Sequence, residues 1–253
     1  MFLNYLRCHD DIGWGLDYAS LRRFGMEERP HKAYLNRYFR GLDGLSGSRG
    51  ELYNEDLVTG DARLCGTTAS LCGLQSALES GDKEAVTKAI DAVVMLHAYM
   101  FMQSGIPVLY SGDEVGQLND DSYHLDPNKA ADSRYLHRGK MDWAAAARAE
   151  VPGTPEYRVF TALSELENIR ADENAFACAA ETATLDTGDN GLLAIRRSLN
   201  GEDVVGIFNF SAGEKNASIS LEGWYRDMLT GEDMTLAEVT VPGNGFYWLK
   251  KTN

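Results

Sequence analysis

The sequence predicts an α/β part followed by an all-β part, a small antiparallel β-sandwich. The first observation is an apolar strand at residues 2–7, a helix at 82–104 and a second apolar strand at 106–110, the order of a βα unit with parallel strands. The second is a change of sequence pattern near residue 175. After it, short segments of alternating apolar and polar residues are separated by Gly, Asn and Asp turns. We therefore expect two domains, at residues 1–172 and 173–253.

Each element of the α/β part has its own pattern. Residues 2–7 are apolar-rich and are followed at once by polar residues, which is typical of a buried strand. Asp82 is placed to cap a helix whose apolar residues recur along one side, and residues 106–110 predict a second fully buried strand. Further helices are expected at residues 31–41 and 156–170.

The all-β part contains four short segments with strand patterning. They are expected at residues 192–197, 203–209, 217–221 and 245–250. Turn residues at 188–191 and 200–202 separate them. About 75 residues is small for a sandwich, which usually has about 100.

The charge balance limits the ligands. The chain has 24 Lys and Arg against 38 Asp and Glu, a formal net charge of -14. This excess opposes a nucleic-acid partner, because binding to phosphates depends on clustered basic residues. Residues 92–110 are uncharged, but His97, Gln103 and the breaker at 104–107 interrupt them, so we expect a buried helix end and a short strand and no membrane span.

The cysteines and the N-terminal sequence indicate the compartment. The four cysteines are sparse and form no C-x-x-C pair, which favours reduced thiols. They are Cys8, Cys65, Cys72 and Cys178. The first residues lack a basic region, an apolar region and a cleavage site for secretion, so a cytoplasmic location is expected.

No cofactor and no metal are expected. The histidines show no metal-ligand spacing, and the glycines form no phosphate-binding cradle. Residues 126–132 resemble a calcium loop but lack the Gly at the sixth position and the terminal Glu. The polar segment from residue 116 to 143 is too long for a simple connector, and such loops usually carry function.

The candidate site residues lie where the first predicted strand ends. His9, Asp10 and Asp11 follow residue 7, and paired carboxylates beside a His and an Arg are used in sugar chemistry. A structural interpretation has about equal weight: Asp11 caps a turn and His9 is a satisfied core residue. Trp14 favours the sugar hypothesis slightly, because an aromatic face can stack on a pyranose.

Four separated blocks, in order, resemble the C-terminal part of an amylosucrase. The blocks are HDDIGW at residues 9–14, TGDAR at 59–63, GIPVLYSGDE at 105–114 and DSR at 132–134. Amylosucrases belong to the alpha-amylase superfamily of glycoside hydrolases. The resemblance implies a C-terminal fragment of a (β/α) barrel, with its seventh and eighth strands in residues 2–110 and the β-sandwich in residues 175–250.

The resemblance also implies roles for individual residues. His9 and Asp10 match the pair that binds the glucosyl hydroxyls in the oxocarbenium-like transition state, with Asp10 as its stabiliser. Asp11 and Arg63 match positions that contact the fructosyl side of sucrose. Arg134 matches an arginine that pairs with an acidic residue on an earlier loop to close the pocket.

The catalytic nucleophile and acid/base of this superfamily belong to the fourth and fifth strands, which precede residue 1 in the family order. Asp113 and Glu114 match the end of the eighth strand instead. We therefore expect the C-terminal part of a retaining sucrose-acting glucosyltransferase or hydrolase that is inactive by itself. By the same resemblance, His31-Lys32 stands where amylosucrases that elongate glucans tend to carry an arginine that binds the acceptor chain, which favours a sucrose hydrolase.

Two alternatives stay open. One is an alpha-amylase or alpha-glucosidase type hydrolase, which would share His9 and Asp10 but less readily Asp11 and Arg63. The other is a non-catalytic carbohydrate-binding or assembly module. Sucrose or an alpha-glucan is the expected ligand. Because two strands cannot close a barrel, exposed barrel surfaces could also pair with a second copy of the chain.

Overall fold

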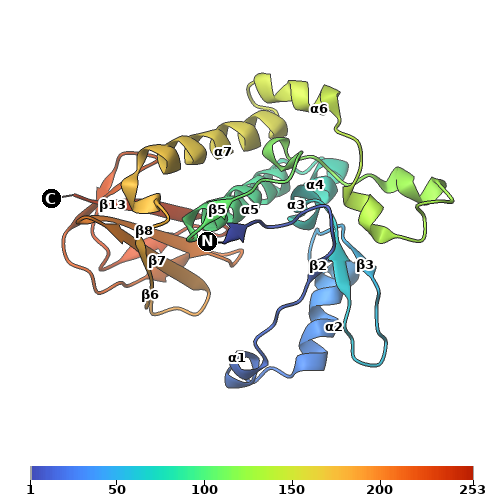
Figure 1. The fold of residues 1–253 in the computed structure, drawn as a ribbon, viewed down its shortest axis with the longest axis horizontal. Helices are drawn as coiled ribbons and strands as arrows, with labels where there is room; N and C mark the ends of the chain where they lie inside the picture. The colour runs from blue at the N-terminus through green and yellow to red at the C-terminus, as the bar shows by residue number, and fades with distance from the viewer. Residues whose placement is uncertain (1, 253) are drawn as a thin grey trace. The chain divides into compact units, whose positions relative to one another are not determined.

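The computed structural model describes residues 2–252 and contains both predicted parts, so the predicted fold class is confirmed (Figure 1). Its residues form two compact units. One comprises residues 7–90 and 109–159, and the other comprises residues 2–6, 91–108 and 160–252. The helices α5 (Lys83–Met102) and α7 (Pro155–Asp172) contribute residues to both units. The domain division expected after residue 172 stays a prediction.

The second unit contains an antiparallel sheet of six strands in the order β11-β10-β13-β8-β7-β6 (Figure 1). The strands are β6 (Glu181–Leu185), β7 (Leu192–Leu199), β8 (Glu202–Asn209), β10 (Trp224–Asp227), β11 (Asp233–Met234) and β13 (Phe246–Thr252). A two-stranded antiparallel sheet pairs β9 (Lys215–Ala217) with β12 (Val239–Val241). Sequence patterning located β7, β8 and β13, whereas the segment expected at residues 217–221 shares only Ala217 with β9. It missed β6, β10, β11 and β12, three of which have only two to four residues.

Apolar side chains from both sheets form one sandwich core. Its members come from β7, β8, β10 and β13 on the large sheet and from β9 and β12 on the small one, for example Val205, Tyr225, Val241 and Leu249. The strand β8 is buried on both faces, because the ring of Phe208 packs against Tyr99 of α5 at 5.7 Å between centroids. This double coverage explains the apolar run in β8.

Two arginines close the C-terminal end of α5. The last carbonyls of a helix have no partner within it. Arg197 of β7 is fully buried and donates to the carbonyl oxygens of Met102, Ala175 and Ala177 at 3.1, 2.9 and 2.7 Å. Arg170 of α7 donates to those of Phe101 and Gly105 at 2.7 and 2.9 Å. These bonds fasten α5 and α7 to the sandwich.

The predicted βα unit is present. The strands β1 (Leu3–Asn4) and β5 (Ile106–Pro107) are parallel, with Leu3 opposite Ile106. The intervening segment contains α5, whose N-terminus is capped as expected: the Asp82 carboxylate accepts from the backbone N–H groups of Glu84 and Ala85 at 2.9 and 3.1 Å. A cap of this kind satisfies helix donors that have no partner in the helix.

The expected burial of these two strands is wrong. Phe2, Leu3 and Tyr5 are 76, 64 and 54% exposed, and Ile106 and Val108 are also exposed. Within residues 2–252 the two strands pair only with each other, so most of their apolar surface is uncovered. Parallel strands usually have both faces covered.

By length and composition alone, α5 could cross a membrane. Its most apolar window of 18 residues is, however, 56% buried inside the structure. Val93 and Ala98 are fully buried, and His97 is nearly so. These features are those of a core helix, as the interruptions in the sequence suggest.

The first unit contains the segments that follow β1 and β5 in the chain. It contains the antiparallel sheet β2-β4-β3, formed by β2 (Ile12–Gly13), β3 (Glu51–Tyr53) and β4 (Arg63–Cys65). The helices are α1 (Tyr18–Arg23), α2 (Glu28–Tyr38), α3 (Thr68–Leu71), α4 (Leu74–Ser80) and α6 (Trp143–Ala147). Short 3-10 helices are η1 (Leu42–Gly44), η2 (Asp113–Val115), η3 (Asp121–Leu125), η4 (Ser133–His137) and η5 (Arg148–Glu150), with η6 (Asn174–Phe176) in the other unit.

The helix expected at residues 31–41 is α2, which begins and ends three residues earlier. Pro30 lies in its first turn. A proline is tolerated there because the first N–H groups of a helix have no acceptor in the helix. A helix start placed after Pro30 is therefore three residues beyond the observed start of α2.

We expect the substitution Arg197→Met to lower the free energy of unfolding by about 2–4 kcal/mol, because it removes the donor to the carbonyl groups of two buried residues, Met102 and Ala175. Urea unfolding followed by circular dichroism measures this. The matched control is Arg226→Met, since Arg226 forms an exposed ion pair with Asp233 and its loss should cost less than about 1 kcal/mol. Equal effects of the two substitutions would refute the role of Arg197.

Candidate functional site

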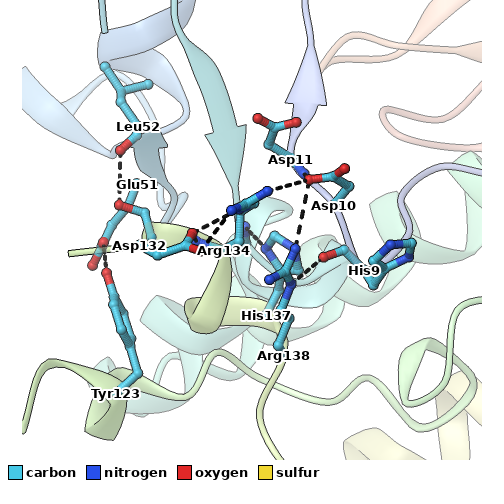
Figure 2. Close-up of polar contacts among 12 residues, drawn as sticks. His9, Asp10, Asp11, Glu51, Leu52, Tyr123, Asp132, Arg134, His137 and Arg138 are labelled. Carbon is cyan, nitrogen blue, oxygen red and sulfur yellow. Dashed lines mark hydrogen bonds and ion pairs between the residues drawn. The ribbon is translucent and has the colours of Figure 1, made fainter. Parts of the chain in front are cut away.

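The Asp10 carboxylate lies among several donors (Figure 2). Its Oδ1 accepts from the backbone N–H of Asp11 at 3.0 Å and from Nη1 of Arg134 at 3.1 Å, and Nη2 of Arg138 lies 3.7 Å away. The backbone hydrogen bond from Asp11 and the bond from Arg134 lower the pKa of Asp10 below its usual value. Asp10 is therefore held as an anion.

Arg134 is positioned by its own loop. Its Nε and Nη2 donate to the two carboxylate oxygens of Asp132, each at 2.8 Å (Figure 2). Its guanidinium lies over the ring of Tyr53 at 4.5 Å from the centroid. Asp132 also caps η4 by accepting from the backbone N–H of Arg134. This two-point pairing fixes the plane of the guanidinium and lowers the pKa of Asp132.

Two further residues of the same loop hold the backbone at His9 and Gly66. Nε of Arg138 donates to the His9 carbonyl oxygen (Figure 2). Nδ1 of His137 accepts from the backbone N–H of Gly66 at 3.1 Å, and the residue is 4% exposed. Burial, together with the charge of Arg7, lowers the pKa of His137 to about 4. His137 is thus a neutral acceptor at physiological pH.

Arg7 and Asp113 form a buried ion pair. Nε and Nη2 of Arg7 lie 2.9 and 2.8 Å from Oδ1 of Asp113, and both side chains are 2% exposed. The guanidinium also lies 4.6 Å from the ring centroid of Tyr110. Glu114, the neighbouring carboxylate, accepts from the backbone N–H of Gly112 at 2.7 Å. Both carboxylates therefore have structural partners that compete with a catalytic role.

His9 and Asp11 do not have the structural roles that the alternative interpretation gave them. His9 is exposed, and its ring points away from Arg134 and Arg138 (Figure 2). The Asp11 carboxylate makes no hydrogen bond within residues 2–252, so it caps no turn there. Both side chains are available beside Asp10.

A cavity of about 390 Å³ lies between the segment from β2 to α1 and the chain that connects β3 with β4. It is lined by Trp14, Tyr18, Asn54, Asp61, Ala62 and Arg63. The Arg63 guanidinium lies against Gly13, where an added Cβ would come within 2.4 Å of Nη1. Among residues 2–252, Arg63 has no hydrogen bond or ion pair. The cavity thus combines aromatic rings with an unpaired guanidinium.

Asn36 of α2 orients one wall of this cavity. Its Oδ1 accepts from Nε1 of Trp14 at 3.2 Å, and its Nδ2 donates to the Gly60 carbonyl oxygen at 3.1 Å. The Trp14 ring packs on Phe39 at 5.4 Å between centroids. Asn36 is 5% exposed, and these two bonds satisfy its buried amide.

The structure brings only some of the expected site residues into contact. Asp10 and Arg134 are bonded, with His9 and Asp11 adjacent in the chain, whereas Arg63 lines the cavity. Asp132, although part of the DSR block, and the two residues His137 and Arg138 were not predicted as site residues from the sequence. The available signal was the long polar loop at residues 116–143, in which a tight group of basic residues follows Asp132 in an otherwise acidic chain.

No metal centre can be built from the part of the chain that the structure describes. Within residues 2–252, no three His, Cys, Asp or Glu side chains are grouped closely enough to hold a metal ion. The segment at 126–132 forms a turn in which the Asp126 carboxylate accepts from the backbone N–H of Asn128 at 3.0 Å.

Comparison with known proteins gives distant likenesses. No model of a known protein family matches the chain. An alpha-amylase from Geobacillus thermoleovorans in complex with acarbose is 15% identical, with a TM-score of 0.49, and the match covers 67% of this chain and 36% of that chain. A trehalose-6-phosphate hydrolase from Bacillus licheniformis is 18% identical, with a TM-score of 0.48 and coverages of 64% and 39%.

An Anoxybacillus alpha-amylase is 18% identical, with a TM-score of 0.46 and coverages of 72% and 36%. All three are glycoside hydrolases of the alpha-amylase family. The chain spans between 36% and 39% of the length of these three proteins. At TM-scores below 0.5 and identities below 20%, the likenesses carry no argument about activity.

We expect the free energy of unfolding to fall as the pH decreases from about 6.5 to about 4. In this range the unfolded chain takes up a proton on His137 that the folded chain does not bind. The contribution of His137 to the free energy of unfolding is therefore fully present above pH 6.5, where the ring is neutral in both states. It falls by up to about 3 kcal/mol by pH 4. Urea unfolding at several pH values measures it.

The matched variant for this measurement is His137→Asn, because an Asn side chain can accept from Gly66 but does not titrate. Its stability should change less with pH over this range. His9→Asn serves as the control, since His9 is exposed. The role of His137 would be refuted if His137→Asn kept the full pH dependence.

Proposed function

We propose that this chain supplies part of the sugar-binding site of a retaining, amylosucrase-like glucosyltransferase or glycoside hydrolase, with sucrose or an alpha-glucan as its ligand. The observation that carries the proposal is the Asp10 carboxylate, held ionised beside His9 and Asp11 by donors from Asp11 and Arg134. The order of the sequence blocks that resemble amylosucrases agrees with it.

An ionised Asp10 suits a stabilising role and not that of a general acid. A carboxylate with a lowered pKa carries no proton at neutral pH, so it has none to donate. Its remaining lone pairs can accept hydrogen bonds from sugar hydroxyls. Such bonds strengthen when positive charge develops on the sugar ring in an oxocarbenium-like transition state. His9, exposed beside Asp10, supplies a further polar group for the same hydroxyls.

The cavity with Arg63 suits a neutral, hydroxyl-rich ligand. The rings of Trp14 and Tyr18 offer apolar faces, and the unpaired guanidinium of Arg63 offers hydrogen-bond donors. Pockets that bind small molecules commonly combine apolar walls with a few such polar groups. A strongly anionic ligand would be opposed by the net charge of -14. We assign this cavity to the fructosyl side of sucrose or to an acceptor sugar.

We propose that the chain binds sugar without cleaving it. Double displacement needs one carboxylate as nucleophile and a second carboxylic acid to protonate the leaving group. Asp113 is buried against Arg7, and Asp10 is held as an anion. An anion has no proton to donate, so Asp10 is not the acid, and the guanidinium of Arg7 occupies Asp113. The acid must therefore come from another residue.

Incubation of the purified chain with sucrose should release no fructose, while calorimetric titration should detect weak binding of sucrose or maltoheptaose. Arg63→Ala should weaken the binding about tenfold through the loss of charge-assisted hydrogen bonds. Arg226→Ala, at an exposed ion pair, is the control. Fructose release that Asp10→Ala abolishes would contradict the proposal that the chain binds sugar without cleaving it. The absence of any sugar binding would contradict the proposed function.

A second candidate function is assembly, which the exposed apolar residues on and beside β1 and β5 favour. Both strands have unpaired edges within residues 2–252, and such edges can pair with another chain. The proposed partner is a second copy of this chain.

Light scattering after size exclusion should therefore give a mass above that of one chain at micromolar concentration. Leu3→Lys, which places a charge on the exposed strand, should shift the mass to that of a monomer. Leu125→Lys is the control, because Leu125 is exposed on η3, which is not part of either strand. A monomeric wild-type chain that unfolds cooperatively would rule out assembly.

A further inference from the structure

Lys32 is a buried cation that bridges two carboxylates. Its side chain is 2% exposed, and its Nζ lies 2.6 Å from Oε1 of Glu28 and 2.6 Å from Oδ1 of Asp61. The ring of Tyr18 is 5.0 Å from Nζ. The only buried residues of α2 are polar, Lys32 and Asn36. Because a buried ammonium is costly unless it is paired, these carboxylates fix its position, and they raise its pKa.

Asp61 faces the same cavity as Arg63. The two residues are two positions apart, and Arg63 is the first residue of β4. Both line the cavity of about 390 Å³. Yet Arg63 has no ion pair within residues 2–252, whereas Asp61 is bonded to Lys32. A cation from α2 therefore binds Oδ1 of a carboxylate that lines the same cavity as Arg63.

We propose that Lys32 is a positioning residue that holds Asp61 away from Arg63 and so leaves the Arg63 guanidinium free to donate hydrogen bonds to a neutral sugar. This inference rests on the proposed function for the identity of the ligand. Pairing between Asp61 and Arg63 would be strong, because a guanidinium can bind both oxygens of a carboxylate. A ligand would then have to break that pair before it could bind.

The local charge balance agrees with a neutral ligand. Glu28 and Asp61 contribute two negative charges, and Lys32 and Arg63 contribute two positive charges, so the group is neutral overall. Removal of the Lys32 charge leaves two carboxylates and one guanidinium. Asp61 would then have Arg63 as its remaining cationic partner in the cavity.

The first experiment uses no sugar. The rate at which phenylglyoxal modifies Arg63, measured by peptide mass spectrometry, reports whether the guanidinium is free. We expect Lys32→Met to slow this modification several-fold, and the double variant Lys32→Met with Asp61→Asn to restore the wild-type rate. Glu28→Gln is the matched control, because it removes the other partner of Lys32 and leaves Asp61 held. Arg226 in the same digest is the internal standard.

A purely structural role of Lys32 predicts a different pattern. If Lys32→Met merely loosened α2, Asp61→Asn would not reverse its effect, and Arg63 would react faster. Circular dichroism and the urea midpoint show whether each variant folds, and Lys32→Arg, which keeps the charge, should behave as wild type. The proposal is overturned if Arg63 in folded Lys32→Met reacts at the wild-type rate or faster.

The second experiment adds sucrose or maltoheptaose in a calorimetric titration. Lys32→Met should weaken binding about five- to tenfold, and the added Asp61→Asn should restore it to within about twofold of wild type. If wild type binds neither sugar but the phenylglyoxal pattern holds, the proposed function fails and the role of Lys32 stands. If all variants bind equally with unchanged Arg63 reactivity, the role of Lys32 fails and the proposed function stands.

Discussion

The candidate site depends on the bond between Arg134 and Asp10, which joins residues 124 positions apart in the chain. The bond works because Arg134 is already fixed by the two-point pairing of its guanidinium with Asp132. A preorganised donor holds an anion at little conformational cost. Without it, the Asp10 carboxylate would keep only the local hydrogen bond from the Asp11 backbone and the more distant charge of Arg138.

Three arginines lie at the site, each in contact with an acidic residue, in a chain whose net charge is -14. Arg134 and Arg138 approach the Asp10 carboxylate, and Arg7 lies buried against Asp113. The three guanidinium groups make different contacts. Arg134 binds the Asp10 carboxylate, Arg138 supports the His9 carbonyl, and Arg7 fastens the chain near the end of the first strand. Because each arginine makes its own contact, the group of basic residues in this acidic sequence was the feature that could have indicated this part of the site.

Buried polar groups also determine the fold within each unit. Arg197 satisfies carbonyl groups at the end of α5, and Lys32 and Asn36 connect α2 to the walls of the cavity. Such groups must be paired when they are removed from water, so they specify one arrangement of the surrounding segments. In α2 the buried residues are the polar Lys32 and Asn36, whereas a surface helix usually buries a stripe of apolar residues.

The sequence alone determined the class of the fold, the helix α5 with its Asp82 cap, the longer sandwich strands and the position of His9 and Asp10 after a strand, because periodicity and capping are local properties. Tertiary structure decided the rest. The exposure of β1, the polar burial of Lys32, and the convergence of Asp132, Arg134, His137 and Arg138 around residues 9 and 10 arise from contacts between residues distant in the chain. Local patterns carry no information about such contacts, since pairing and burial depend on which segments meet in space.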